Sequence, residues 1–191
     1  LPETIVEKLV DVDEYDSTEV QRVVVSSLET IAQDQPSTLL NTPDMIAALF
    51  SDICCHDDSF IRVYGLRAVR SLVNEDPNIL LKSESELRPA IVKAVTHKHT
   101  ETSVTGMLPV MELPKDDLNL LLESNIWDTI ATSLQADAAI MRATACRCIQ
   151  TVISETTEID QLLEEEELSA VPDLLSDSDS RVRREAHRVI S

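Results

Sequence analysis

A pattern of apolar positions recurs along the chain about every forty residues. One copy predicts an amphipathic helix over residues 57–74, with acidic residues at its start and Pro77 after its end. Its apolar face is formed by residues spaced four, four and three apart, namely Ile61, Gly65, Val69 and Leu72. This spacing places their side chains on one side of a helix.

The same face occurs at four other places. The positions equivalent to Ile61 are Val20, Thr102, Met141 and Val182, so that successive copies are 41, 41, 39 and 41 residues apart. We call this residue position zero and number each repeat from it. A fixed period in this range is typical of a solenoid built from helical pairs.

The residues around position zero resemble the HEAT repeat. The shared pattern is Asp-x-x-x-(Val/Ile/Met)-Arg-x-x-(Ala/Gly), seen as DDSFIRVYG, DAAIMRATA and DSDSRVRREA. Repeats 1 and 3 differ from this pattern, because they have Gln21 and Ser103 at the position where arginine is expected. The resemblance to this HEAT-repeat (armadillo-like) family covers essentially the whole chain. It implies an all-α fold, a right-handed α-solenoid of about five HEAT-like helical pairs.

We therefore expect a single solenoid over residues 1–191. Its repeats are predicted at about 1–36, 42–77, 83–114, 122–154 and 163–191. The first helix of repeat 1 is predicted in PETIVEKLVDV, and Pro36 and Pro77 are expected to close repeats 1 and 2. Pro109 lies in the middle of the second helix of repeat 3, where it should break or kink that helix. The chain begins with Leu1 rather than Met, so we expect a fragment of a longer chain or a processed one.

Both glycines of the chain fall at position +4. Gly65 and Gly106 stand where other repeats have Val24, Ala145 and Ala186. A small residue there indicates a close approach between neighbouring helices. We expect Gly65 to accept alanine but not leucine.

Charge narrows the possible partners. Acidic residues number 35 against 16 basic ones, giving a net charge of −19, which makes nucleic acid an unlikely partner. Three interpretations stay open: a solvated acidic surface, adaptation to high salt as in the proteins of halophiles, or a surface for basic partners. No apolar run suggests a membrane helix, and four cysteines without CxxC spacing favour reduced thiols in the cytoplasm.

No catalytic signature is present, so we predict neither an enzyme nor a cofactor. A Gly-rich phosphate loop, GxSxG, HExxH and paired CxxC are all missing from the sequence. We expect a non-enzymatic scaffold that presents a concave helical surface to a protein partner, whose identity stays open, as does the oligomeric state. The alternative is a HEAT-like enzyme or nucleic-acid-binding solenoid that resembles DNA glycosylases or chromophore lyases. That class needs aromatic residues in the groove, whereas Trp127 is predicted on a first helix.

Two sets of arginines recur in the second helices. Arg62, Arg142 and Arg183 occupy position +1, and the resemblance implies a structural ladder in which they pair with aspartates of the inter-helix turns. The candidate partners are Asp57, Asp58, Asp137, Asp177 and Asp179. Arg67, Arg147 and Arg188 occupy position +6 and could form a partner-binding stripe on the concave face. The alternative for this second set is solvated charges that balance nearby acids.

A cluster of sulfur and imidazole groups leaves one further alternative open. Cys55 and His56 precede the second helix of repeat 2, and His97 and His99 precede that of repeat 3. Cysteine and histidine are zinc ligands, but this spacing does not define a tetrahedral site. We expect histidines in exposed turns and packed thiols rather than a metal site.

Overall fold

The computed structural model describes residue 15 and residues 17–81, 85–113, 125–155 and 166–191. Within these residues the regular elements are helices, and no strand occurs. None of these helices has both the length and the apolar character needed to cross a membrane. The first helix predicted for repeat 1 lies outside the described residues. The chain divides into two compact parts, residues 1–94 and 95–191, which are described in turn.

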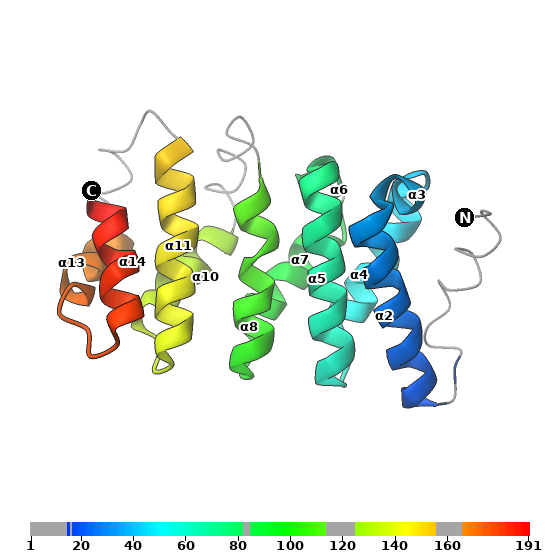
Figure 1. Cartoon of the computed structure of the whole chain (residues 1–191), viewed down its shortest axis with the longest axis horizontal. Coiled ribbons are helices and arrows are strands. Elements are labelled where there is room, and N and C mark those ends of the chain that lie inside the picture. The colour runs from blue at the N-terminus through cyan, green and yellow to red at the C-terminus, as the bar shows by residue number, and fades with distance from the viewer. Residues whose placement is uncertain (1–14, 16, 82–84, 114–124, 156–165) are drawn as a thin grey trace. The chain divides into compact units, whose positions relative to one another are not determined.

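The described residues of the N-terminal part form three longer helices and several short ones. Its elements are α2 (Thr18–Asp34), α3 (Pro36–Leu40), α4 (Pro43–Cys55), α5 (Ser59–Glu75), α6 (Asn78–Leu81) and most of α7 (Leu87–Val95). Helices α2 and α5 pack side by side in one layer, and α4 packs against α5 (Figure 1). The core between them consists of apolar side chains such as Leu28, Phe50 and Leu66, each fully buried.

The C-terminal part repeats this arrangement. Its elements are α8 (Thr100–Met107), η2 (Pro109–Glu112), α10 (Asn125–Thr132), η4 (Ser133–Gln135), α11 (Ala139–Glu155), η5 (Glu166–Ala170), α13 (Val171–Leu174) and α14 (Ser180–Ile190). Helix α11 packs against both α8 and α14, and α10 packs against α11 (Figure 1). Trp127 on α10 is buried.

The predicted second helices are confirmed. Helix α5 covers the segment predicted from its apolar face, and α2, α11 and α14 follow the other copies of that face. Position zero is fully buried in Ile61, Thr102 and Val182, and position +4 is buried in all five repeats. Val20 differs, because its side chain is 43% exposed. The first helix expected to face it lies outside the described residues.

The prolines at the repeat boundaries act differently from the prediction. Pro36 is the first residue of α3, and Pro77 directly precedes α6, so short helices separate the predicted pairs. Proline suits the first turn of a helix because its missing N–H would have no intrahelical partner there. Leu39 and Leu80 anchor these short helices in the core. The expected break at Pro109 is confirmed, since α8 ends at Met107 and a 3-10 helix follows.

Gly65 marks a close contact between α4 and α5. A Cβ atom added to Gly65 would lie 2.2 Å from Cγ2 and 3.4 Å from Cβ of Ile53. Isoleucine is branched at Cβ and stiff at χ1, so this methyl group cannot rotate away freely. The expectation that Gly65 accepts alanine is therefore wrong, because even one methyl group displaces Ile53.

We predict that Gly65→Ala lowers the free energy of unfolding. Overpacking costs about 1–3 kcal/mol, and the gain of about 1 kcal/mol in helix propensity offsets only part of it. Urea denaturation followed by circular dichroism measures the change.

The matched control is a pair of double variants. Ile53→Ala removes Cγ2 and should make Gly65→Ala nearly harmless in that background. Ile53→Val keeps a methyl group at the same place, so the loss of stability caused by Gly65→Ala should be unchanged in that background. Equal losses in all three backgrounds would show that the contact with Ile53 is not the cause.

Candidate functional site

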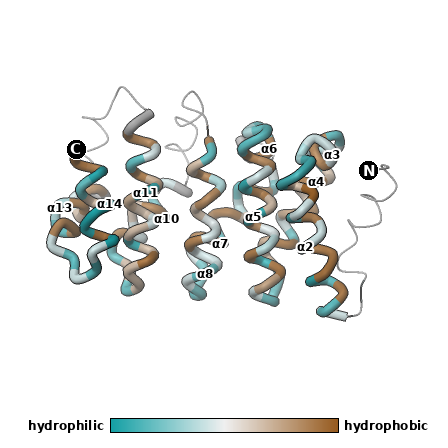
Figure 2. Tube along the Cα trace, in the orientation of Figure 1, coloured by the Kyte–Doolittle hydropathy of each residue, from teal (hydrophilic) through white to brown (hydrophobic). Residues whose placement is uncertain are grey.

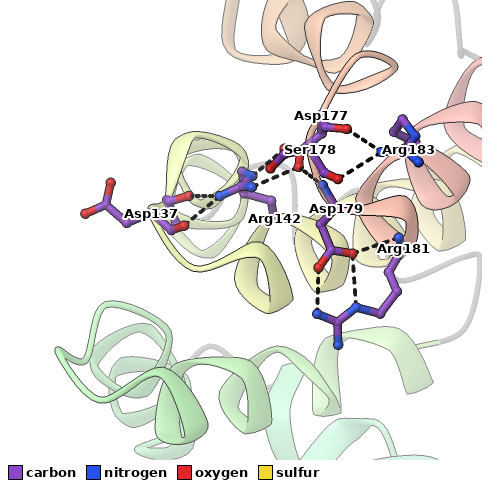
Figure 3. Close-up of polar contacts among 8 residues, drawn as sticks. Asp137, Arg142, Asp177, Ser178, Asp179, Arg181 and Arg183 are labelled. Carbon is purple, nitrogen blue, oxygen red and sulfur yellow. Dashed lines mark hydrogen bonds and ion pairs between the residues drawn. The ribbon is translucent and has the colours of Figure 1, made fainter.

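The arginines at position +1 hold the turns between first and second helices. Arg62 donates from Nη1 to the carbonyl oxygens of His56, at 2.5 Å, and Asp57, at 2.7 Å. Arg142 and Arg183 donate from Nη1 to the carbonyl oxygens of the residues six and five positions earlier, at distances of 2.7 to 3.0 Å. Figure 3 shows these contacts for Arg142 and Arg183. Each guanidinium thus satisfies carbonyl groups that the chain leaves unpaired where a helix ends.

Carboxylates add bonds between successive repeats. Arg142 donates from Nε to Oδ2 of Asp177 at 2.7 Å and from Nη2 to Oδ1 at 3.0 Å, a two-bond pair (Figure 3). Arg22, at position +2, donates to both oxygens of Asp58 in the same manner, at 3.3 and 2.6 Å. Among the aspartates proposed from the sequence, Asp177 is thus the carboxylate bound by Arg142. Asp58 instead binds an arginine that the sequence pattern did not select.

These contacts set the ionisation of the turn aspartates. Hydrogen bonds from Arg142 hold the pKa of Asp177 below its usual range, and those from Arg22 do the same for Asp58. The pKa of Asp179 is lowered mainly by the side chain of Arg181, whose Nη2 lies 2.7 Å from Oδ2 (Figure 3). Asp58, Asp177 and Asp179 are therefore charged at neutral pH and held by hydrogen bonds.

The turn histidines His56 and His97 accept hydrogen bonds from the backbone. Nδ1 of His56 accepts a hydrogen bond from the backbone N–H of Asp58 at 3.0 Å, and Nδ1 of His97 accepts one from His99 at 3.1 Å. Asp177 accepts the equivalent bond from Asp179 at 2.8 Å. In the described part of the chain, no group of three or more His, Cys, Asp or Glu residues could hold a metal ion. The zinc alternative with Cys55, His56, His97 and His99 thus finds no ligand set there.

Three of the four cysteines belong to the core. Cys54, Cys146 and Cys148 are buried, and burial raises the pKa of each thiol, that of Cys146 to about 12. Cys55 is half-buried. All four are free thiols.

The arginines at position +6 point away from the core. Arg147 is exposed and Arg67 is half-buried, and neither forms an ion pair with a described residue. Arg188 is 56% exposed and donates from Nη1 to Oε2 of Glu185 at 2.8 Å. Arg147 and Arg188 lie on the adjacent helices α11 and α14, whereas Arg67 belongs to the N-terminal part. Their alignment in one concave stripe stays a prediction.

Glu185 is a buried carboxylate that sequence reasoning missed. It lies on α14, which is mostly hydrophilic in Figure 2, yet its side chain is only 4% exposed. Arg184 donates from Nε to Oε1 at 3.0 Å, while Arg188 binds the other oxygen. A buried carboxylate needs such partners to offset its lost hydration. The available signal was arginine on both sides of an acid, one residue before and three after it.

A pair of stacked aromatic rings on α5 was also missed. The centroids of Phe60 and Tyr64 are 3.9 Å apart, and the rings are 18° from parallel. The guanidinium carbon of Arg67 lies 5.2 Å from the centroid of Tyr64, and that of Arg22 lies 5.8 Å from the centroid of Phe60. Aromatic residues four apart, with arginine three residues later, share one helix face. The sequence therefore contained this signal.

Known structures identify the fold. No protein-family model matches the sequence, and no curated protein matches it. A designed armadillo repeat protein in complex with the peptide (KR)4 is 16% identical, with a TM-score of 0.78 over 96% of this chain and 79% of that chain. Computationally designed armadillo repeat proteins for modular peptide recognition give a TM-score of 0.77 at 16% identity, over 95% of this chain and 79% of that chain. An engineered protein is 17% identical and gives a TM-score of 0.75 over 97% of this chain and 77% of that chain. The chain thus has an all-α, armadillo-like repeat fold, as the HEAT-like pattern implied.

We predict that Asp177→Asn lowers stability at neutral pH more than at acidic pH. The folded-state pKa of Asp177 is depressed, so its charge stabilises the fold above about pH 4, the usual range of unfolded aspartate. This contribution is lost as the pH falls through the folded pKa. Urea denaturation should show a difference in the free energy of unfolding between Asp177→Asn and wild type that is smaller at pH 3 than at pH 7. Asp128→Asn is the control, because Asp128 is exposed and forms no ion pair with a described residue. A difference of constant size would contradict the assignment.

We also predict that one thiol of four reacts rapidly in the folded protein. Thiolate is the reactive form, and burial keeps Cys54, Cys146 and Cys148 protonated and covered. Titration with a chromogenic disulfide at pH 8 should label Cys55 first, and all four after denaturation. Cys55→Ser should remove the rapid phase. Persistence of that phase would mean that a core thiol is reached in the native state.

Proposed function

We propose that this chain is a non-enzymatic scaffold that binds a protein partner through the exposed faces of its second helices. One observation carries this proposal. Arg67 and Arg147 occupy the same repeat position and pair with no described carboxylate, although acidic residues outnumber basic ones by 35 to 16. We therefore propose that these guanidinium groups bind another molecule.

Arginine is suited to this task. Its planar group presents several N–H donors in a fixed geometry that matches a carboxylate, and it is weakly hydrated. Arg188 remains 56% exposed while it binds Glu185, so part of its donor surface is also accessible. These features favour a partner that carries negatively charged groups.

The fold supports a peptide-like partner. A structural neighbour of this chain is a designed armadillo repeat protein in complex with the peptide (KR)4. That peptide is basic, whereas the free arginines here favour an acidic one, so we propose that this chain shares the mode of binding but not the ligand charge. Four free cysteines fit a reducing compartment, and we expect the protein to act in the cytoplasm.

We predict that the triple variant Arg67→Gln, Arg147→Gln, Arg188→Gln loses partner capture while keeping its helical content. Glutamine removes the charge without placing a new acid beside Glu185. Affinity capture from native lysate with quantitative mass spectrometry measures the retained partners. If the arginines serve only local pairs, capture should stay unchanged, with stability losses of about 0–1 kcal/mol each.

The charge-matched control is Arg88→Gln, Lys93→Gln, Lys98→Gln, which changes the net charge equally but lies outside the second helices. Its capture should resemble wild type. Equal losses in both triple variants would point to a net-charge effect and contradict the proposed surface.

A further inference from the structure

We propose that Arg22, Phe60, Tyr64 and Arg67 form a docking patch for an acidic peptide segment that also carries an apolar side chain. We call these residues the α2–α5 patch. Here we build on the proposed function and name the partner class for the N-terminal part. The patch lies on helices α2 and α5, which pack side by side (Figure 1), and the guanidinium of Arg22 on α2 lies over the ring of Phe60 on α5.

The apolar half of the patch consists of two partly exposed aromatic rings. Phe60 is 36% exposed, and Tyr64 is half-buried. The whole chain has only one Trp, two Tyr and two Phe, and it places two of them in this stacked, partly exposed pair. Aromatic side chains supply much of the binding energy in protein interfaces because they bury large areas at low entropy cost.

The charged half is the guanidinium of Arg67. Its guanidinium carbon lies over the ring of Tyr64, 5.2 Å from the ring centroid, and a contact with the face of a ring occupies no hydrogen-bond acceptor. Arg67 forms no ion pair with a described residue, so its N–H donors can bind a carboxylate. Arg22 differs because both oxygens of Asp58 occupy it, and it serves to hold Phe60 in position.

Helix geometry relates the two halves. Phe60 and Arg67 are seven residues apart on α5, which corresponds to about 10 Å along the helix axis. An extended peptide advances about 3.3 Å per residue. The apolar and the acidic residue of the ligand should therefore be separated by roughly three positions.

A basic peptide fits this patch poorly. The cations of Arg22 and Arg67 already lie over the two aromatic rings, so a lysine or arginine of the ligand would meet like charge. The net charge of −19 attracts basic ligands to the chain as a whole, but it does not favour them at these rings. The contacts available at the α2–α5 patch therefore favour an acidic peptide over a basic one.

The test is selection from a random dodecapeptide phage library on the immobilised full chain. We expect enrichment of peptides with an apolar or aromatic residue about three positions from Asp or Glu. Selected peptides are then synthesised, and fluorescence anisotropy measures their dissociation constants. Phe60→Ala and Arg67→Gln should each weaken binding about tenfold. Arg67→Lys should also weaken it, because lysine keeps the charge but loses the planar stacking.

Two controls separate binding from folding. Leu175→Ala changes an exposed apolar residue outside the patch and should leave the dissociation constant unchanged. Circular dichroism and thermal melting check each variant. If Phe60→Ala fails to fold, Phe60→Leu keeps an apolar side chain, removes the ring stack and takes its place.

The outcomes distinguish this inference from the proposed function. Enriched basic peptides, or acidic peptides whose binding ignores Phe60 and Arg67 but depends on Arg147, would overturn the α2–α5 patch and leave a peptide-binding scaffold. A library that yields no specific peptide on the chain would count against both. Acidic–apolar peptides sensitive to Phe60 and Arg67 would support both.

Discussion

In repeats 2, 4 and 5, the guanidinium at position +1 is the constraint that holds the turn between the two helices. Such a turn contains carbonyl groups that have no partner within the helices. Arg62, Arg142 and Arg183 meet this need with the same pair of bonds, to the carbonyls six and five residues earlier. Nη1 carries two N–H groups, so this one nitrogen of arginine can donate to both carbonyls. The second helix is thereby fixed to the turn from which it starts.

The same helix carries a second arginine at position +6, whose side chain points in a different direction from the one at position +1. Five residues along a helix correspond to a rotation of about 140°, so a side chain at +6 points away from one at +1. Arg62 is only 5% exposed, whereas Arg67 is half-buried and its guanidinium lies over the ring of Tyr64. Fixing the first arginine in the turn thus sets the direction of the second. The orientation of the proposed binding surface follows from the bonds that hold the turn.

The periodicity of the sequence made much of this fold predictable, and the predictions that were wrong have local causes. Position zero and position +4 define long amphipathic helices, which a repeated 3.6-residue pattern reports well. Helices α3 and α6 have five and four residues, too few to display that period, so their prolines looked like repeat ends. The contact between Gly65 and Ile53 depends on how closely two helices approach, and glycine in sequence does not reveal whether one methyl group fits.

The candidate site, like the fold, was predictable from the sequence only in part. The sequence located the arginines but not their acceptors, because backbone carbonyls carry no sequence signature. It also passed over Phe60 and Tyr64, since two aromatic residues at helical spacing usually belong to a core. Their exposure is a property of which helix face the neighbouring elements leave open. Sequence alone therefore supplied the positions of the functional groups, and packing supplied their availability.

Net charge and local contact act on a partner at different distances. A chain of net charge −19 repels an acidic peptide at long range, but at physiological ionic strength this field decays over about 8 Å. Within that distance the proposed ligand would meet Arg67, which forms no ion pair with a described residue, beside the rings of Phe60 and Tyr64. Added salt would weaken the long-range repulsion and the contact ion pair together, whereas it would leave the burial of apolar surface favourable. In the proposed complex, the aromatic pair would therefore supply the part of the binding energy that is insensitive to salt, and the arginine would supply the selection for negative charge.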